Sequence, residues 1–329
     1  MKWIFLPNYK LCLCEVNLVG LQSENHTTVL RAEAVTALVQ NTDGFYVDGT
    51  FGRGGHSEAI LDSLSSKGRL LAIDKDPEAC AWARLHFAKD ERFVIERGSF
   101  EDLTQMVERQ SCLGQVAGVL LDLGVSSPQL DDPDRGFSFL RDGPLDMRMD
   151  PDRGQSAEQW LAAARADEIS RVLRDYGEEK YARRMARAIV AARDESAITR
   201  TGQLADIIAA ANPAWEKHKH PATRAFQAIR IFINRELEEL RQLLDGVLDV
   251  LAVGGRLVVI SFHSLEDRII KRFIRGHERP FIAKNLPLRE SEILRRMRSV
   301  GKAIKASEQE VMANPRARSA VMRVAEKLA

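Results

Sequence analysis

The sequence predicts an α/β protein: a Rossmann-like, doubly wound parallel sheet with an all-helical domain inserted into it. Three observations lead to this prediction. Strand-like and helix-like segments alternate as far as Asp122, which is typical of a parallel sheet with helices on both faces. A glycine-rich turn follows the first strand of the series. The alternation stops near residue 131 and returns after residue 220, which indicates an insertion.

The first part of the sheet can be placed element by element. A helix is expected from about Arg31, because Ala34, Val35 and Leu38 follow at helical spacing. Pro77 suits the first turn of a later helix. Segments rich in β-branched and aromatic side chains predict strands at residues 45–48, 68–74, 92–96 and 116–122, with helices beginning near residues 57, 77 and 100.

The turn after the first expected strand reads Asp48-Gly-Thr-Phe-Gly-Arg-Gly-Gly-His-Ser57. Its glycines let the backbone approach a ligand without a Cβ atom in the way, and the next helix points its free N–H groups into the same crevice. A turn that serves only the fold is the alternative. Ser57 stands where the dinucleotide fingerprint has its third glycine, so the turn alone is a weak signal for a nucleotide-like cofactor.

Acidic and polar residues stand at the carboxyl ends of the expected strands, where open parallel sheets bind ligands. Asp48, Asp74 and Asp122 close three of these strands, and residues 98–100 follow another. Asp74 is placed to accept hydrogen bonds from ribose hydroxyls. Its alternative role as a helix cap is better filled by Asp76. The polar loop from Leu123 to Gln129 lies at the same edge, with plain turn chemistry as an equal alternative.

The insertion is expected to be a loop followed by helices. Ser156 and Gln159 have the spacing of a capping box, and further helices are expected at residues 167–176 and 178–194. The apolar stripe of Tyr181, Met185 and Ile189 is interpreted as core. The arginines around it fit either a solvated face or a phosphate-facing one.

The chain returns to the sheet after the motif His220-Pro-Ala-Thr-Arg224. Leucine and isoleucine spacing predicts one long helix from Pro221 to Leu251, with a kink near Gly246, followed by a strand at residues 256–262. His263 and Ser264 then stand at a carboxyl end, in or beside the crevice, and a last strand is expected at residues 319–325.

Composition narrows the classes of function. The formal net charge is +1, but residues 263–305 carry twelve Lys or Arg against five acids, the footprint of a polyanion partner or of a solvated helix face. The cysteines Cys12, Cys14, Cys80 and Cys112 lack Cys-x-x-Cys spacing, so we expect a reducing compartment and no metal. No segment has the length of a membrane span or the pattern of a signal peptide, which predicts a cytoplasmic protein.

These features together predict a nucleoside-containing cofactor that is bound without phosphates. The first turn is rich in glycine, an acid is placed for a ribose, and no Gly-Lys-Ser/Thr turn for a triphosphate is present. S-Adenosylmethionine fits this description.

Five motifs in order resemble those of the bacterial small-subunit ribosomal RNA cytosine-N4 methyltransferases. They are Asp48 to Ser57, Asp122-Leu-Gly-Val-Ser-Ser-Pro-Gln-Leu-Asp131, Gly143-Pro-Leu-Asp-Met-Arg-Met149, His220 to Arg224, and Ser261-Phe-His-Ser-Leu-Glu-Asp-Arg268. The resemblance runs from His26 to the end. It implies a methyltransferase domain in two parts, 26–130 and 221–329, around an inserted helical domain, 131–220. Residues 1–25 form an N-terminal extension to which nothing is carried over.

The resemblance also implies a substrate and a set of contacts. The substrate is one cytidine in the decoding region of the small-subunit RNA. The implied contacts to S-adenosylmethionine are Gly54, Gly55, His56, Asp74, Phe100, Asp122 and Gln129. Asp146, His220, Arg224 and His263 are candidates for holding the base or its phosphates, and a purely structural role is an equal alternative for each histidine.

The chemistry requires an acceptor for the amine protons of cytosine, because the amine shares its lone pair with the ring. We expect the loop from Asp122 to Pro128 to supply it, through Asp122, Ser126, Ser127 or backbone carbonyls. The Asp/Asn-Pro-Pro-aromatic loop of other amino methyltransferases is absent, so the acceptor stays open. The base must be unstacked to enter such a pocket.

Two other functions remain as alternatives. A nicotinamide-dependent oxidoreductase would need the glycine pattern that is incomplete here. An RNA-binding assembly factor with an inactive cofactor pocket would share the motifs without the activity. The oligomeric state is left open.

Overall fold

The computed structural model describes residues 28–214, 220–279 and 294–329. The expected N-terminal extension, with Cys12 and Cys14, and residues 280–293 of the basic segment lie outside the described residues. Cys80 and Cys112 are buried free thiols. None of the helices in the described ranges combines the length and the apolar composition that a membrane span requires.

One mixed sheet organises the described chain. Five strands are parallel: β1 (Phe45–Asp48), β2 (Arg69–Asp74), β3 (Phe93–Arg97), β4 (Val116–Asp122) and β5 (Leu251–Ser261). The strand β8 (Val321–Lys327) pairs antiparallel with β5, and β6 (Met297–Ser299) and β7 (Ile304–Lys305) pair with β8. The strand order is β3-β2-β1-β4-β5-β8-β6, which confirms the doubly wound α/β class.

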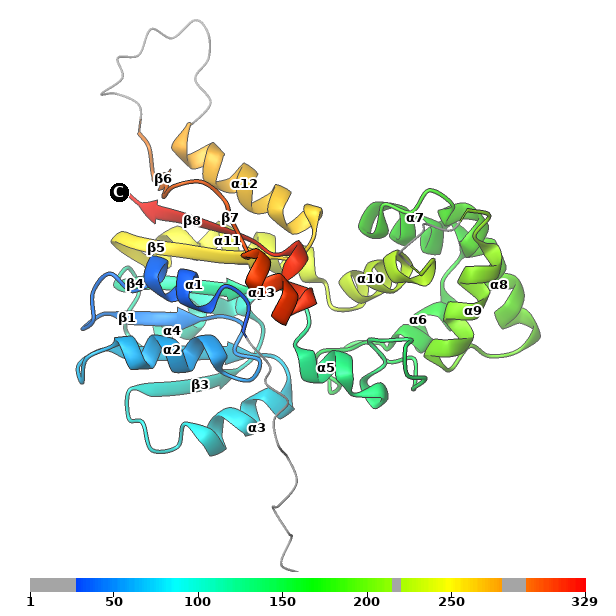
Figure 1. Ribbon diagram of the computed structural model, residues 1–329, viewed down its shortest axis with the longest axis horizontal. Coiled ribbons are helices and arrows are strands. Elements are labelled where there is room, and N and C mark those ends of the chain that lie inside the picture. Colours follow the sequence, from blue (N-terminus) through cyan, green and yellow to red (C-terminus); the bar gives the residue numbers. More distant parts are fainter. Residues whose placement is uncertain (1–27, 215–219, 280–293) are drawn as a thin grey trace, which may run out of the picture.

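Alternating side chains of the strands supply two cores, one on each face of the sheet. Tyr46, Leu120 and Val258 belong to one core cluster, and their neighbours Val47, Leu121 and Val259 belong to another. The helices α1 (Arg31–Leu38), α2 (Gly55–Ser63) and α3 (Pro77–His86) cover the first face. The helices α4 (Leu103–Arg109), α11 (Glu236–Val250) and α12 (Ser264–Glu278) cover the second (Figure 1).

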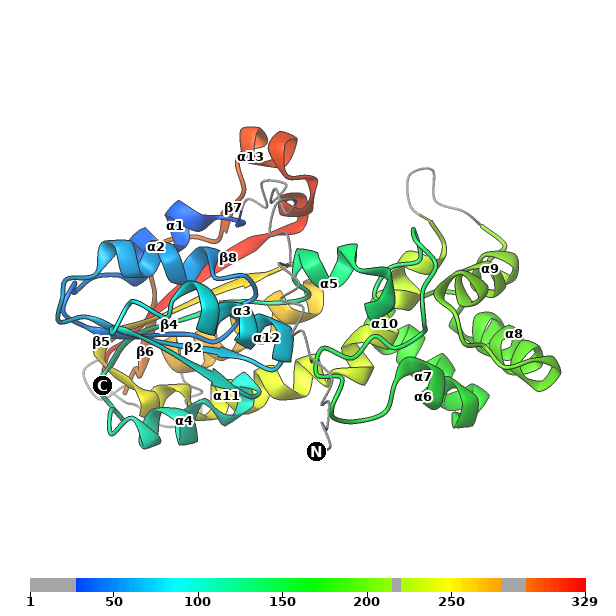
Figure 2. The same ribbon diagram turned by 90° about the horizontal axis from the view of Figure 1, so that it is seen from below.

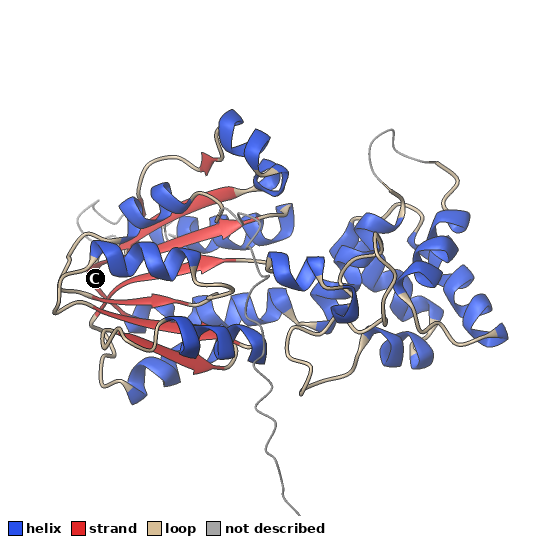
Figure 3. Cartoon of the chain, turned by 60° about the horizontal axis from the view of Figure 1, so that its bottom comes forward, coloured by secondary structure: helices blue, strands red, loops and turns tan. Residues whose placement is uncertain are grey.

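A helical body lies beside the carboxyl ends of the parallel strands (Figure 2). It contains α6 (Ala157–Ala163), α7 (Ala166–Gly177), α8 (Ala182–Glu195), α9 (Thr201–Ala211) and α10 (Ala222–Ile233). These helices enclose a third core with Trp160, Leu173, Met185, Ile208 and Ile229, so the expectation that Met185 belongs to a core is confirmed. Figure 3 shows the strands gathered in the other half of the molecule. The helix α10 packs on α7 and α9, although the sequence division assigns its residues to the sheet domain.

The expectation of one long helix from Pro221 to Leu251 is wrong. The chain turns at Arg235, whose φ of 52° lies in the left-handed region, and the turn separates α10 from α11. Asn234 fixes the break, because its side-chain amide donates to Met147 O at 2.7 Å and accepts from Met149 N at 2.7 Å. Gly246 lies within α11, where a Cβ atom would come within 2.5 Å of Thr104 Oγ1, so this glycine allows close packing of α11 on α4.

Several short elements were not expected. The helix α5 (Ser127–Asp131) follows β4, and α13 (Glu308–Ala313) precedes β8. The described basic segment contains α12 and then the strands β6 and β7. The strand β5 begins at Leu251, earlier than the expected residue 256, so that Gly254 and Gly255 lie within it.

Candidate active site

The strand order reverses between β1 and β4, and this switch point is where open α/β sheets bind ligands. Asp48 ends β1 and Asp122 ends β4 on the neighbouring strand. The two residues therefore lie at the carboxyl edge of the sheet on neighbouring strands, and this switch-point region is called the crevice below.

The glycine turn between β1 and α2 is held to the end of β2. Gly52 N donates to Asp74 Oδ2 at 2.8 Å, and Asp76 N donates to Asp74 Oδ1 at 2.9 Å. Gly54 has a φ of 80°, which favours glycine. A Cβ atom on Gly55 would lie 1.8 Å from Thr28 Oγ1. Part of the glycine pattern therefore serves packing against residues that precede α1.

Asp48 is fully buried below this turn. Its carboxylate accepts from Ser57 Oγ at 2.7 Å and from Thr50 N at 3.1 Å. Burial raises the pKa of Asp48 to about 6, and the nearby Asp74 adds to the shift against these two hydrogen bonds. Burial also raises the pKa of Asp74.

Of the three carboxylates, that of Asp122 has the fewest hydrogen bonds to the described residues. Its Oδ1 is buried and has no hydrogen-bond partner among the described residues. Its Oδ2 lies 3.7 Å from Nδ1 of the buried His56. Burial, followed by the charges of Asp48 and Glu266, raises the pKa of Asp122 well above its usual range. The backbone N–H of Asp122 donates to Thr50 Oγ1 at 2.6 Å, which fixes the residue at the strand end.

This arrangement favours a ligand with positive charge and hydrogen-bond donors. Three carboxylates with raised pKa values, those of Asp48, Asp74 and Asp122, surround the turn. A cationic group in the crevice would stabilise their ionised forms and give Asp122 Oδ1 the partner it lacks. The sulfonium and ammonium groups of S-adenosylmethionine fit this donor requirement.

Phe100 lies next to the same crevice. It begins the short 3-10 helix after β3 (Phe100–Asp102) and is buried. A Cβ atom on Gly49 would lie 3.5 Å from Phe100 Cβ, which places the ring-bearing residue close to the end of β1. Its position at a strand end was the only signal in the sequence.

The loop after β4 is braced by Gln129. Gln129 Oε1 accepts from Ser126 N at 3.0 Å, and Gln129 Nε2 donates to Asp76 Oδ2 at 2.7 Å. Both ends of this side-chain amide are thus bonded within the protein. Ser126 precedes α5 as its N-cap, and Ser127 is the buried first residue of that helix. The three residues therefore lie together, and Gln129 holds the loop in place.

Asp76 is a central residue that the sequence reasoning assigned only to a helix cap. It does cap α3, by accepting from Glu78 N at 3.0 Å. The same carboxylate accepts from Gln129 and from Arg135 Nη1 at 2.8 Å. Arg135 Nη2 also donates to Met149 O at 2.9 Å. The hydrogen bonds of Asp76 and Arg135 therefore join α3, the loop after β4 and the loop that leads into the helical body.

Three of the expected substrate residues belong to the helical side. Asp146 accepts from Arg148 Nε at 2.8 Å and from Arg148 Nη2 at 2.7 Å. His220 lies just before α10, and its ring stands 4.7 Å from that of Phe139. Arg224 is in the first turns of α10. Arg135 and Asp76 connect the loop that carries Asp146 with the crevice.

His263 lies at the crevice end of β5, as expected, and begins α12 as its N-cap. Its Nε2 is 3.0 Å from Glu266 Oε1, yet neither ring nitrogen has a hydrogen bond of good geometry within the described residues. Glu236, His263 and Glu266 together have the residue types of a metal site. However, Glu236 pairs with the half-buried Arg230 through contacts of 2.8 and 2.9 Å, so a guanidinium already supplies positive charge there.

Comparison with known proteins identifies the family. Residues 23–328 match the MraW methylase family. An rRNA methylase from Streptococcus thermophilus is similar in structure at 12% identity and a TM-score of 0.40, covering 91% of this chain and 94% of that one. The fibrillarin of Aeropyrum pernix, solved with natively bound S-adenosylmethionine, is similar at 9% identity and a TM-score of 0.39, covering 90% of this chain and 74% of that one. These structural likenesses are weak, and the assignment rests on the match along the sequence.

The matched range includes the five motifs and the crevice residues, so the resemblance found in the sequence is confirmed. The cofactor of this chain is S-adenosylmethionine. The chain belongs to the MraW methylase family, and it is an S-adenosylmethionine-dependent methyltransferase of ribosomal RNA.

Proposed function

We propose that the chain methylates the exocyclic N4 amine of one cytidine in the decoding region of small-subunit (16S) ribosomal RNA. The observation that carries this proposal is the buried, unpartnered Oδ1 of Asp122 at the switch point of the sheet. A buried acceptor of this kind calls for a donor from a ligand. The cytosine amine and the cofactor both carry such donors.

The cofactor residues are proposed from the family motifs and their place around the turn. Gly54 and Gly55 shape the start of α2, where His56 packs, and Asp74 and Phe100 lie at the ends of β2 and β3. In this proposal Asp74 accepts from the ribose hydroxyls. Both of its oxygens already accept one backbone hydrogen bond, and each retains a lone pair for a second. Gln129 acts by holding the loop rather than through a free amide.

The amine of cytosine must lose its conjugation before it attacks. S-Adenosylmethionine, when bound, supplies an electrophilic methyl group. We assign to Asp122 the role of accepting a hydrogen bond from one amine proton and then that proton. The nitrogen lone pair would form the new N–C bond as the bond between methyl and sulfur breaks, and the electron pair of that bond would stay on the sulfur. The raised pKa of Asp122 suits a base, because a carboxylate in its usual range is a poor proton acceptor. Ser126, Ser127 and the backbone carbonyls of the loop are alternatives to Asp122 as the acceptor. With Asp122 in that role, they would accept a hydrogen bond from the second amine proton.

The substrate side of the proposal uses the helical body. Asp146, His220, Arg224 and His263 are proposed to hold the unstacked base or its phosphates. Asp146 and Arg148 are bound to each other and would act as one unit.

Transfer to small subunits tests the function. Subunits from a strain that lacks this gene would be incubated with the protein and labelled S-adenosylmethionine, and the digested RNA would be analysed for N4-methylcytidine. The proposal requires label in that nucleoside. Label in another nucleoside would contradict the N4 assignment, and no label at any stage of assembly would favour an inactive assembly factor.

A further inference from the structure

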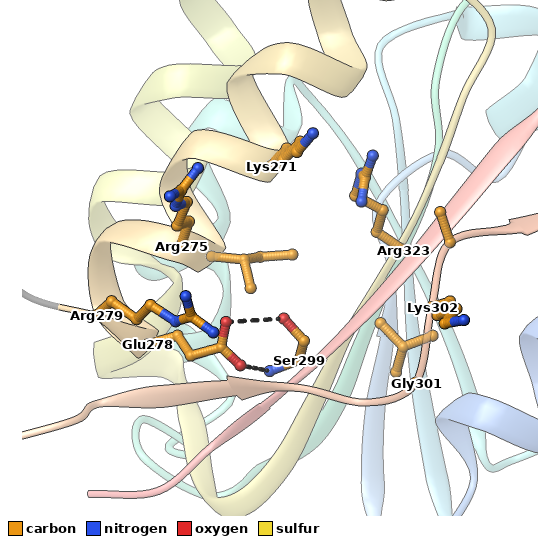
Figure 4. A pocket seen from close by; sticks show the side chains of 11 residues that line it. Lys271, Arg275, Glu278, Arg279, Ser299, Gly301, Lys302 and Arg323 are labelled. Atoms are coloured by element: carbon orange, nitrogen blue, oxygen red, sulfur yellow. Dashed lines mark hydrogen bonds between the residues drawn. The ribbon is translucent and has the colours of Figure 1, made fainter.

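A second, strongly basic pocket lies on the α12 side of the sheet, away from the crevice. It has a volume of about 260 Å³ and is enclosed by α12, β6, β8 and the turn after β6 (Figure 4). Ile274 and Val324 supply apolar contacts within it. Four cationic side chains line it: Lys271, Arg275, Arg279 and Lys302. The name cation pocket is used for this site below.

These four cations have no acidic partner in the part of the chain that the structure describes. All four are exposed, and none forms an ion pair within residues 28–214, 220–279 and 294–329. The acid in the lining, Glu278, is engaged by Ser299, whose N–H donates at 3.1 Å and whose hydroxyl donates at 3.3 Å. The fifth cation, Arg323, is bound by Asp267 at 2.6 and 3.0 Å. The free charge of the pocket is therefore positive.

The spacing of the cations on α12 points to an extended anion. Lys271 and Arg275 stand four residues apart and so lie on one face of α12, and Arg279 follows as the C-cap of the helix. Like charges at this spacing destabilise a helix, and bound anions remove this repulsion. The helix begins at His263 in the crevice, and at 1.5 Å per residue Lys271 and Arg279 lie about 12 and 24 Å along its axis.

We propose that the cation pocket binds backbone phosphates of the ribosomal RNA whose cytidine enters the crevice. The identity of the polyanion rests on the proposed function. Arginine guanidinium groups bind phosphate oxygens in pairs, and a row of cations matches the regular charges of a nucleic-acid strand. The apolar residues of the pocket are buried or small, which disfavours a lipid surface, since a membrane-binding face needs exposed apolar side chains. The pocket sets RNA affinity and register, and it takes no part in methyl transfer.

A triple variant, Lys271→Gln/Arg275→Gln/Lys302→Gln, tests the pocket. A matched control, Lys67→Gln/Arg84→Gln/Lys89→Gln, removes three exposed cations near the opposite edge of the sheet. Binding of small-subunit RNA would be measured by filter retention over a range of potassium chloride concentrations. Each lost phosphate contact lowers the slope of log affinity against log salt by about 0.7 to 0.9, so the pocket variant should lose about 2 to 3 and the control nothing.

Two further readouts separate this inference from the proposed function. S-Adenosylmethionine affinity and turnover at saturating RNA should be unchanged in the pocket variant, because its three positions lie outside the crevice. A wild-type salt slope in the pocket variant would overturn the inference even if N4 methylation is found. Failure of the wild-type protein to form N4-methylcytidine would remove the proposed function, while the slopes would still decide whether the pocket binds RNA. Loss of binding to anionic lipid vesicles with an unchanged RNA slope would overturn the inference in favour of a membrane contact.

Discussion

His56 Nδ1 faces Asp122 Oδ2 across 3.7 Å, and the opposite nitrogen of the same ring, Nε2, lies 3.2 Å from Val29 O. A carbonyl oxygen only accepts, so Nε2 carries the ring proton and Nδ1 presents a lone pair to the carboxylate. Burial lowers the pKa of His56 to about 4. At neutral pH the His56 ring is therefore uncharged and the contact is not an ion pair, and a ligand donor or a proton on Asp122 would complete it.

The protonation state of His56 is the first prediction. Because burial outweighs its hydrogen bond to Val29, the ring should stay neutral from about pH 8 down to about pH 5. Nitrogen-15 chemical shifts of the histidine rings would show this, with a protonated Nε2 and a bare Nδ1. The folded pKa lies below the unfolded value of 6.5, so this group lowers stability as the pH falls from 6.5 toward about 4. An imidazolium signal from His56 at neutral pH would contradict the assignment.

Asp48→Asn should stabilise the protein without its cofactor, and the gain should depend on pH. Asparagine can still accept from Thr50 N, and its amide can donate to Ser57 Oγ, so both contacts survive. The pKa of Asp48 rises from 3.8 to about 6 on folding, so the wild type loses stability as the pH rises between these values and stays at the lower level above them. Urea unfolding at about pH 8 should favour the variant by on the order of 1–3 kcal/mol, and near pH 4 the gap should vanish. An equal gap at both pH values would rule out titration of Asp48 as the cause.

The hydroxyl of Thr50 holds the backbone of Asp122 in place, so its removal should weaken ligand binding at the crevice. Thr50→Val keeps the shape but leaves Asp122 N without its 2.6 Å acceptor. We expect a loss of about 1–3 kcal/mol in the free energy of unfolding, together with weaker S-adenosylmethionine binding by calorimetry. Thr50→Ser, which retains the hydroxyl, serves as the control and should lie close to the wild type. Equal behaviour of the two variants would show that the hydrogen bond does not matter.

Asp76→Ala should destabilise the link between the sheet and the helical body. The ion pair with Arg135 is largely buried, with side-chain exposures of 5% for Asp76 and 11% for Arg135. Removing one partner leaves an uncompensated charge, which costs about 3–5 kcal/mol. Glu78→Ala is the matched control, because Glu78 lies 3.8 Å from the same guanidinium but is 57% exposed. Chemical denaturation should therefore separate the two variants, and similar losses would show that burial of the pair is not decisive.

The sheet and its crevice could be predicted because their signals are local. Strand residues alternate between two cores, and Asp48, Asp74 and Asp122 end strands that are neighbours in the sheet order expected of a doubly wound fold. The break at Arg235 could not be predicted, because the apolar spacing continues through it. Its cause is a contact between Asn234 and a loop far away in the chain. Short strands such as β6 carry too few residues for a pattern.

Side-chain roles were predicted less well than positions. The glycine pattern was interpreted as room for a ligand, but Gly55 also makes room for Thr28. Asp76 was interpreted as a helix cap, and its contacts with Gln129 and Arg135 depend on loops that meet only in the fold. The place of Asp122 at the switch point follows from strand order, whereas its unpartnered oxygen becomes visible only in the structure.

The most direct test of the central claim compares the wild type with Asp122→Asn on small subunits that lack the modification. Both proteins would be given saturating labelled S-adenosylmethionine, and the formation rate of N4-methylcytidine would be measured by nucleoside mass spectrometry, with RNA affinity as the control. We expect unchanged RNA binding and a rate at least about 100-fold lower in the variant, because the amide cannot take the amine proton. A variant that forms N4-methylcytidine at the wild-type rate would contradict the assignment of Asp122 and, with it, this account of the crevice.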